Sequence, residues 1–351
     1  MSPGPDRRSL GSRLDRLPWS GRHTVILLAL GAGWLFDSFE VQLFSSAVGP
    51  LGDHFGASVT ARDAVLAVWL VGILLGALLG GPLTDRFGRR RLFVATLIWY
   101  AGFTVLTGLA PTLGVVYLLR FAAALGVGAE YAIVTTAIAE FMPARVRGRA
   151  NAAVMNFWPA GAILAALLAY LLLDVAALGA AVSWRHMFFY LVGNVGALAG
   201  GLAMSLVIDR VGRRATVIAS YSAAAAGVGL LAAATATGSS GWVTGAFVVA
   251  SAAATAAWTS AYPTFTELFP THLRGAGVGA SVAAGRVSAI VGTLLLPSVA
   301  TSLGASASYG LVAAFWLVGV AAMAAFSARG GPEAAGLPLE SLAPPALVAA
   351  A

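Results

Sequence analysis

The stretch Gly81-Pro82-Leu83-Thr84-Asp85-Arg86-Phe87-Gly88-Arg89-Arg90 lies between two long apolar runs, and its core returns later as Ile208-Asp209-Arg210-Val211-Gly212-Arg213-Arg214. A second signature repeats in the same order. Glu140-Phe141-Met142-Pro143-Ala144-Arg145-Val146-Arg147-Gly148 returns as Glu267-Leu268-Phe269-Pro270-Thr271-His272-Leu273-Arg274-Gly275. Two different signatures in one order indicate an internal duplication, in which each half of the chain carries one copy of both.

Length and composition place the chain in a membrane. It has 351 residues, of which 59% are hydrophobic and only 10% charged, so it has more apolar surface than a water-soluble core could bury. Several stretches are long enough, as helices, to cross a hydrocarbon layer about 30 Å thick. The sequence therefore predicts an all-α membrane protein with about ten transmembrane helices, at roughly 24–49, 63–83, 92–110, 113–142, 150–173, 187–208, 216–235, 241–268, 276–300 and 306–328.

The basic residues follow a topological pattern. The net charge of +7 comes from arginine alone, and 17 of the 21 arginines fall in the terminal segments or in alternate short loops. This is the positive-inside distribution and not the basic face of a nucleic-acid-binding protein. We expect a multi-pass protein of the plasma (inner) membrane with both termini in the cytoplasm. Its N-terminal segment at 1–22 is expected to be no cleaved signal, and 329–351 to be a flexible cytoplasmic tail.

Several kinds of chemistry are not indicated by the sequence. It contains no cysteine and its four histidines lack metal-ligand spacing, so disulfides, thiol nucleophiles and metal sites are not expected. No nucleophile with a base and no phosphate-binding loop is recognisable. We therefore do not expect an enzyme, a cofactor or a nucleic-acid partner.

Three motifs in the first half resemble those of a known family. The loop at 81–90, the stretch at 120–131 that begins Arg120-Phe121 and ends Gly-Val-Gly-Ala-Glu-Tyr, and the turn at 140–148 are similar to signatures of the major facilitator superfamily. Within it they resemble the sugar porter and metabolite/proton symporter branches. The resemblance extends over residues 24–328, and it implies two six-helix halves that transport by alternating access.

The chain is shorter than this resemblance implies. Two six-helix halves would place the second loop signature after eight spans, whereas here it follows six. We infer a fusion near Gly193-Asn194 that joins the start of the usual sixth helix, at 184–189, to the end of the usual eighth, at 195–209. Every later loop then keeps its expected side. The predicted organisation is an N-terminal helical half at 23–183 and a shortened C-terminal helical half at 184–328.

Charged residues inside the first and fourth spans are the candidates for proton coupling. Asp37 lies near the middle of the first span, and Glu40 follows on the same helix face. An ionised carboxylate there is costly without a partner, and Arg120 in the fourth span is the natural counterion. In proton-coupled sugar porters, an acid and an arginine at the positions of Asp37 and Arg120 act together in coupling. The alternative is that the acids lie near an aqueous vestibule and have no coupling role.

Other deep polar and aromatic residues are candidates for a solute cavity, namely Glu130, Asn156, Trp158, Trp258, Tyr262 and Arg286. Arg286 either meets an anionic substrate or is neutralised by a neighbouring carboxylate. Asn156 would supply hydrogen bonds, and the aromatic rings flat stacking surfaces. Each aromatic side chain alone is explained equally well by packing or by the membrane interface.

The repeated loops supply a candidate cytoplasmic gate. The family resemblance implies that charge pairs at these loops hold one state of the gate and release in the other. The residues at the matching positions are Asp85, Arg86, Arg89, Glu140 and Arg147 in the first half, and Asp209, Arg213, Glu267 and Arg274 in the second. The alternative is that the arginines only set the topology.

We therefore predict a secondary active transporter that moves a small polar metabolite, an organic acid or a sugar-like solute, together with protons. Tyr262 stands where the sugar branch usually has tryptophan, and the paired glutamines of that branch belong to the seventh helix, which this chain is expected to lack. A strict sugar/proton symporter is therefore an alternative. Another is a truncated membrane protein that no longer transports, or a remnant that binds a partner. The expected partners are the solute, protons and the lipid bilayer, and the sequence indicates no oligomeric state.

Overall fold

The protein is built from long helices. The structure, a computed structural model, describes residues 17–175, 184–337 and 339, and these contain no strand, which confirms the predicted all-α class. The elements are α2 (Gly21–His54), α3 (Val59–Phe87), α4 (Arg89–Thr107), α5 (Leu113–Phe141), η1 (Ala144–Val146), α6 (Arg147–Met155), α7 (Phe157–Val175), α8 (Trp184–Val211), α9 (Arg213–Ala236), α10 (Ser240–Leu268), η2 (Thr271–Leu273), α11 (Arg274–Leu303) and α12 (Ala305–Ala328).

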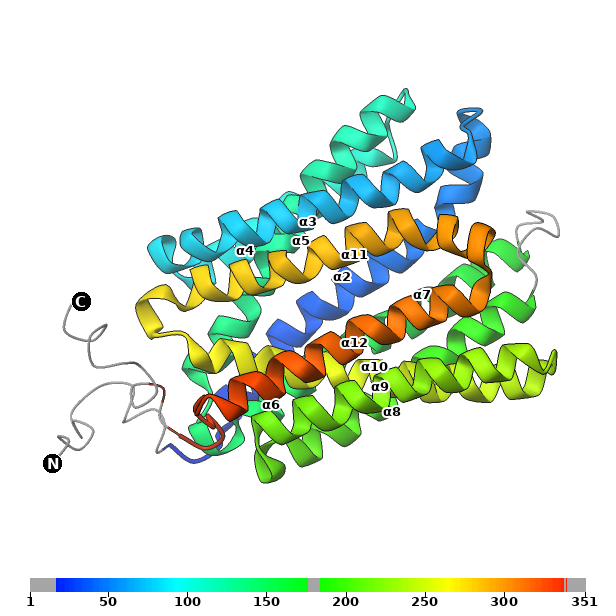
Figure 1. The fold of residues 1–351 in the computed structure, drawn as a ribbon. Helices are drawn as coiled ribbons and strands as arrows, with labels where there is room; N and C mark the ends of the chain where they lie inside the picture. Colours follow the sequence, from blue (N-terminus) through cyan, green and yellow to red (C-terminus); the bar gives the residue numbers. More distant parts are fainter. Residues whose placement is uncertain (1–16, 176–183, 338, 340–351) are drawn as a thin grey trace, which may run out of the picture.

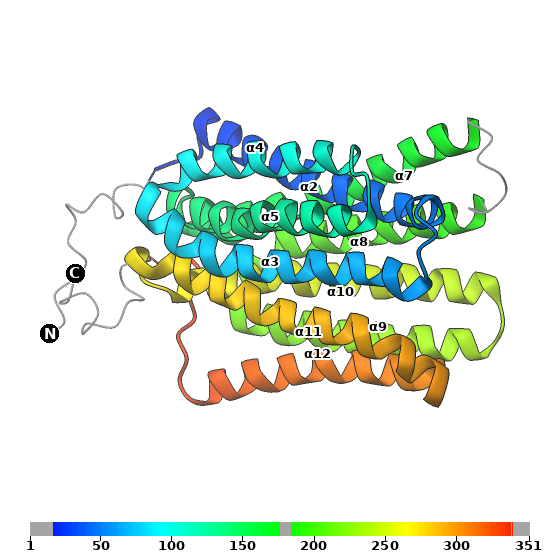
Figure 2. The same ribbon diagram turned by 90° about the horizontal axis from the view of Figure 1, so that it is seen from above.

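The long helices run side by side, so that their connections fall at the two ends of one bundle (Figure 1, Figure 2). The turns that contain the repeated signatures lie together at one end, which we call the arginine-rich end. Helix α2 starts and α12 finishes at this end as well. The duplicated motifs of the two halves are thereby brought into contact.

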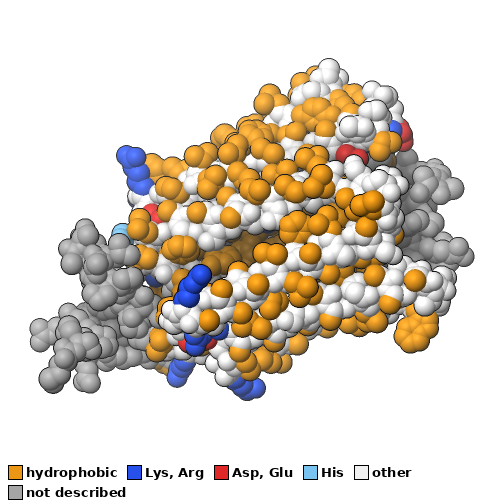
Figure 3. All heavy atoms as spheres, viewed as in Figure 1, with side chains coloured by type: hydrophobic (Ala, Val, Ile, Leu, Met, Phe, Trp, Pro, Cys, Tyr) orange, Lys and Arg blue, Asp and Glu red, His pale blue; other side chains and the backbone are white. Residues whose placement is uncertain are grey.

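The surface of the bundle suits a bilayer. Nine helical segments of the described chain are long and apolar enough to cross a membrane, and α4 adds a further long helix that opens with Arg89-Arg90-Arg91. This agrees with the predicted number of about ten spans. Figure 3 shows hydrophobic side chains spread along the visible face, with most of the charged ones towards its ends. Such a surface is expected where helices contact lipid.

The predicted span at 150–173 is divided into α6 and α7 at Asn156. Pro159 follows closely, and it has no amide hydrogen to donate to the carbonyl of Met155 four residues before it. The backbone amide of Asn156 instead closes α6 on the carbonyls of Ala152 and Ala153, each at 3.2 Å. The break therefore follows from the sequence, and it lies where α6 packs against α8.

Helices α3 and α11 join the two halves through glycine. A Cβ atom on Gly81 would lie 2.3 Å from the carbonyl oxygen of Gly275, and one on Gly279 would lie 2.2 Å from that of Ala77. Any larger residue at these positions would force the helices apart. Gly81 belongs to the repeated loop signature, so one motif supplies both the close helix crossing and the charges beside it.

Helix α8 is continuous from Trp184 to Val211 and runs straight through the predicted fusion near Gly193-Asn194. It packs against α6 and α7 on one side and against α10 on the other. A Cβ on Gly200 would lie 2.0 Å from the carbonyl oxygen of Ala252 in α10, which shows how close that approach is. The division into halves at residue 183 stays a prediction, because α8 contacts both.

Candidate functional site

Asp37 lies in the middle of α2 with no exposed surface, and neither of its carboxylate oxygens has a hydrogen-bond partner in the described part of the chain. The predicted pair between Asp37 and Arg120 is wrong, because Arg120 forms its ion pair with Glu40. Thr104 of α4 donates a hydrogen bond of 3.2 Å to the same oxygen of Glu40. The two acids of α2 thus have different environments.

Aromatic side chains explain why Arg120 pairs with Glu40 and not with Asp37. The Cζ atom of Arg120 lies 3.8 Å from the ring centroid of Phe44 and 4.0 Å from that of Trp69. Phe44 is one helical turn beyond Glu40, on the side away from Asp37. Cation–π contacts therefore hold the guanidinium at the level of Glu40 and beyond the reach of Asp37.

Glu130 of α5 is the neighbour that Asp37 does have. Glu130 is fully buried, and neither of its carboxylate oxygens has a hydrogen-bond partner among the described residues. A Cβ on Gly33 would lie 2.6 Å from Oε1 of Glu130, and Gly33 is one turn from Asp37 on α2. The two carboxyl groups interact electrostatically, and Tyr100 of α4 lies beside Asp37. Two acids without cations thus share the centre of the bundle.

Five aromatic rings pack next to these acids, and we call them the aromatic cluster: Trp34, Tyr131, Trp158, Trp258 and Tyr262. Ring centroids are 4.6 Å apart for Trp34 and Tyr131, 5.7 Å for Trp158 and Trp258, and 6.0 Å for Trp258 and Tyr262. The rings come from α2, α5, α7 and α10. The cluster therefore joins both halves of the chain.

Arg286 of α11 faces the aromatic cluster. Its Cζ atom lies 4.7 Å from the ring centroid of Tyr131 and 6.0 Å from that of Trp258. No carboxylate of the described chain lies within ion-pair distance of Arg286. The neutralising acid that the sequence left open is thus not found in the residues that the structure describes.

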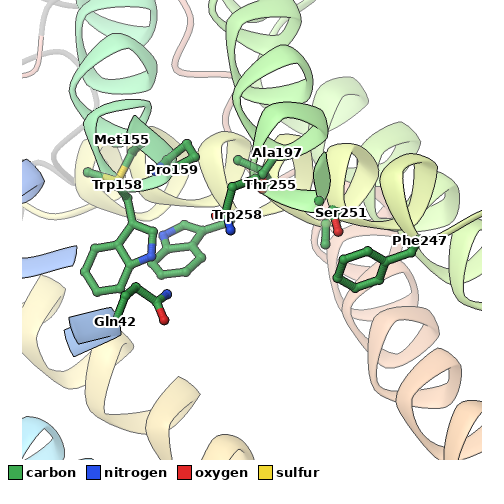
Figure 4. A pocket seen from close by; sticks show the side chains of 12 residues that line it. Gln42, Met155, Trp158, Pro159, Ala197, Phe247, Ser251, Thr255 and Trp258 are labelled. Carbon is green, nitrogen blue, oxygen red and sulfur yellow. The ribbon is translucent and has the colours of Figure 1, made fainter. Parts of the chain in front are cut away.

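A cavity of about 280 Å³ lies against the cluster, with Trp158 and Trp258 in its wall. In Figure 4 the two indole rings lie side by side, with the amide of Gln42 close to them. Ser251 and Thr255 of α10 also line this cavity. Sequence reasoning missed Gln42, Ser251 and Thr255, although Ser251 and Thr255 lie four residues apart and therefore share one face of their helix.

Asn156 was expected to line the solute cavity, but it does not line this one. Its Nδ2 atom donates to the carbonyl oxygen of Ala152 at 2.9 Å and to Oγ of Ser205 at 3.1 Å. A Cβ on Gly201 would lie 2.0 Å from its Oδ1. The break between α6 and α7 turns Asn156 towards α8, so its side chain belongs to a helix interface.

A second cavity, of about 590 Å³, lies between α2, α4 and α5. Its lining includes Glu40 and Arg120, with Thr104 at the same level and mostly apolar side chains elsewhere. The ion pair is therefore not closed off by protein on every side. The aromatic rings in contact with Arg120 partly replace this missing cover.

At the arginine-rich end, the acid of the first repeated loop reaches the second half. Arg89 pairs with Asp85 at 3.0 Å and with Glu140 at 2.7 Å, and Glu140 also contacts Arg274 at 3.4 Å. Asp85 accepts hydrogen bonds of 3.2 and 3.0 Å from the backbone amides at 275–276. These amides lie in the first turn of α11, where an acid is stabilised by unpaired N–H groups and by the helix dipole.

The second repeated loop makes the reciprocal contact. Arg213 pairs with Asp209 at 2.9 Å and with Glu267 at 2.8 Å. Asp209 accepts hydrogen bonds of 3.1 and 2.9 Å from the backbone amides at 148–149, which lie in the first turn of α6. Each half thus caps a helix of the other, and the bundle is closed at this end.

Two of the predicted gate arginines differ from the rest. Arg86 is exposed, and no acid of the described chain pairs with it; its guanidinium lies 5.4 Å from the ring centroid of Phe87. Asp85 is paired one helical turn further on, with Arg89, so Arg86 is directed elsewhere around the helix. The placement of Arg86 in the charge network is therefore corrected. Arg147 is buried and donates to the carbonyl oxygen of Leu337 at 3.3 Å.

Residues 329–337 were expected to be a flexible tail, but they are held against α9. Glu333 accepts hydrogen bonds from the backbone amides of Arg213 at 2.7 Å and Arg214 at 3.2 Å, and Arg214 donates to the carbonyl oxygen of Gly331 at 2.9 Å. The first turn of α9 offers unpaired amides that an acid can cap. The expectation is wrong for this segment, while 340–351 and most of the predicted N-terminal segment lie outside the described residues.

The environment of Glu333 lowers its pKa. Partial burial raises the pKa, but the hydrogen bonds from the backbone amides and the charge of Arg213 lower it by more, so that the pKa lies below its usual range. The ionised carboxylate is thus the form that caps α9.

Replacing Arg213 with alanine should destabilise the protein strongly. Asp209 and Glu267 have side chains only 5% and 1% exposed, so both would become buried charges without their main partner. Breaking such a pair costs about 3–5 kcal/mol. Unfolding in detergent, followed by tryptophan fluorescence, measures the effect. Arg86→Ala is the control because Arg86 has no acid partner, and equal unfolding midpoints for the two variants would contradict the assigned network.

Acidification should release residues 329–337. Because the folded pKa of Glu333 is lowered, its contribution is complete above the unfolded value of about 4.3 and is lost as the pH falls through the folded value. The sequence has no cysteine, so a spin label on Leu337→Cys reports the segment alone. The label should gain mobility on acidification, and at every pH when Glu333→Gln is added. An unchanged spectrum would show that Glu333 does not hold the segment.

Comparison with known families covers nearly all of the helical region. The family described as Major Facilitator Superfamily matches residues 30–200, and the family described as Sugar (and other) transporter matches 190–344. The chain is 32% identical over 161 residues to the niacin transporter NiaP of Acinetobacter baylyi, which is 46% of this chain and 37% of that protein. It is 30% identical over 134 residues to the 4-hydroxybenzoate transporter PcaK of Pseudomonas putida, 38% of this chain and 29% of that one. The matches thus span less than two fifths of these relatives.

A solved structure supports the fold over a greater length. The proton:xylose symporter XylE superposes with a TM-score of 0.74 at 16% identity, covering 91% of this chain and 98% of the XylE chain. The family and the relatives are transporters and not enzymes, which confirms that no enzyme is to be expected. The duplicated loop signatures thus led to the correct family, and this chain belongs to the major facilitator superfamily.

Proposed function

We propose that the protein is a secondary active transporter of a small planar organic acid that works by alternating access. The observation that carries this substrate class is Arg286, whose guanidinium lies 4.7 Å from the ring of Tyr131 and 6.0 Å from that of Trp258. A cation within a membrane-spanning bundle is costly unless something neutralises it. A carboxylate on the solute would supply the charge that the described residues do not.

Two further observations support an acid over a sugar. The names of the relatives NiaP and PcaK refer to niacin and 4-hydroxybenzoate, each a carboxylate on an aromatic ring. The aromatic cluster offers flat faces against which such a ring can pack. A neutral sugar would leave Arg286 without a counter-charge, so a strict sugar/proton symporter is the second choice.

Arg286→Gln should weaken the uptake of nicotinate and 4-hydroxybenzoate, measured as KM in proteoliposomes, by about ten- to a hundredfold, because a hydrogen bond to a charged group contributes about 1.5–3 kcal/mol. Arg286→Lys should retain part of the affinity. The control is Arg90→Gln, at an exposed position.

The same assay tests the alternatives. Uptake of xylose in preference to both acids would favour a sugar symporter. Folded wild-type protein that moves none of these solutes would favour the partner-binding alternative without transport. Equal uptake by wild-type protein and Arg286→Gln would remove Arg286 from the substrate site.

For proton coupling, we propose the carboxyl groups of Asp37 and Glu130 in place of the predicted pair of Asp37 and Arg120. Arg120 is already paired with Glu40, whereas no cation of the described chain forms an ion pair with the buried carboxyl groups of Asp37 and Glu130. Two neighbouring carboxylates repel in a low-dielectric interior, so at least one takes up a proton when water is excluded. A state that admits water to the pair would release it.

Asp37→Asn and Glu130→Gln should each abolish accumulation driven by an imposed pH gradient, because an amide carries no titratable proton. Exchange of labelled for unlabelled acid across the membrane should continue, since it needs no net proton movement. The matched control is Asp63→Asn, at an exposed position at the opposite end of the bundle. Gradient-driven accumulation that survives in both variants would show that protons are not carried at this pair.

We infer that the arginine-rich end is cytoplasmic, in a plasma membrane. The clustering of basic residues at this end supports the orientation. The reciprocal contacts of Asp85 and Asp209 close this end, so the solute cavity would be reached from the opposite side in this state. We expect a membrane-impermeant maleimide to label the Arg90→Cys variant only after the cells are opened.

A further inference from the structure

The cavity beside Trp158 and Trp258 contains polar groups that the described protein leaves without partners. The side chains of Gln42, Ser251 and Thr255 line its wall, and none of them takes part in a hydrogen bond of its side chain within the described residues. No charged residue is part of the lining. The cavity therefore suits an uncharged group that donates or accepts hydrogen bonds.

The hydroxyl groups of Ser251 and Thr255 make no hydrogen bond to the backbone of their own helix. Serine and threonine within helices usually bond back to the carbonyl four residues before. Thr244 and Thr264 of α10 do so, each at 2.7 Å. Ser251 and Thr255 do not, although all four residues lie on α10. Their hydroxyl groups are thus available to a molecule in the cavity.

Trp258 adds a second, independent feature. Its indole Nε1 is buried beside Tyr262 and makes no well-formed hydrogen bond in the described chain, whereas buried tryptophan usually makes one. The same ring forms part of the cavity wall and lies 6.0 Å from the guanidinium carbon of Arg286. One ring therefore connects the cation to the polar cavity.

We propose that Gln42, Ser251 and Thr255 form a polar subsite that binds an uncharged substituent, a hydroxyl group or a ring nitrogen, on the planar acid whose carboxylate is directed to Arg286. This inference rests on the proposed function, and it adds the residues that discriminate among planar acids. A ring packed along Trp258 would have its charged end at Arg286 and its other end at this subsite.

The volume of the cavity limits the size of this molecule. At about 280 Å³ it lies just below the usual range for small-molecule sites. The ring of Phe247 and the indoles of Trp158 and Trp258 form apolar walls beside the polar groups. The geometry therefore favours a single aromatic ring with one polar substituent over a larger or highly hydroxylated solute.

The test compares three probes, benzoate, 4-hydroxybenzoate and nicotinate, by calorimetric titration of the purified full chain. Wild-type protein should bind 4-hydroxybenzoate or nicotinate about three- to tenfold more tightly than benzoate, the range expected for one neutral hydrogen bond. Thr255→Val and Gln42→Met should each reduce this preference while leaving the affinity for benzoate within about twofold. Thr255→Ser, which restores a hydroxyl group, should keep the preference.

Thr244→Val is the matched control, because it removes a hydroxyl group from the same helix that is already bonded to the backbone. It should behave as wild type, and the unfolding midpoint of each variant shows that it is folded. A preference unchanged in folded Thr255→Val and Gln42→Met would overturn the subsite, as would equal wild-type binding of the three acids. Wild-type protein that binds none of them would overturn the proposed function, and the subsite with it.

Discussion

A charge inside a membrane-spanning bundle needs a partner from the protein, and this requirement organises most of the structure. Arg120 lies between the rings of Phe44 and Trp69 and pairs with Glu40. Arg213, at the arginine-rich end, is enclosed by two acids. Against this background the exceptions lie close together at the centre. Asp37 and Glu130 have no cation, and Arg286 has no anion, within the described chain. The charges that we propose for protons and solute are those that the fold does not use.

The duplication of the sequence becomes a reciprocal contact in space. Asp85 of the first half caps α11, and Asp209 of the second half caps α6. Each acid also holds the arginine four residues after it, so the loop and the helix of the opposite half are linked through one carboxylate. Opening this end requires both caps to separate, because each ties the same two halves together. A gate at this end would therefore open in one step.

The repeated signatures located most of the ion pairs of the arginine-rich end, since a motif that occurs twice fixes both the residue types and the loops that carry them. Arg86 was the exception, because a motif does not say which way each arginine points. The pairing of Asp37 with Arg120 failed for another reason. Helical spacing tells which face of α2 carries Asp37 and Glu40, but not which of them lies level with Arg120. That level is set by Phe44 and Trp69, whose contacts exist only after packing. Gln42 and Thr255 were missed because helical spacing does not say which polar face of a helix borders a cavity.

The shortened chain keeps the constellation from which the proposed site is built. Its acids, rings and cation come from α2, α5, α7, α10 and α11, and α8 crosses the inferred fusion without a break. The cavity of about 590 Å³ beside Glu40 and Arg120 gives this ion pair less cover than a fully enclosed pair would have. Asp37, one turn deeper on α2, has no exposed surface at all. A proton carrier must be shielded in one state and reached by water in another, and of the two acids of α2 only the deeper one is fully shielded here.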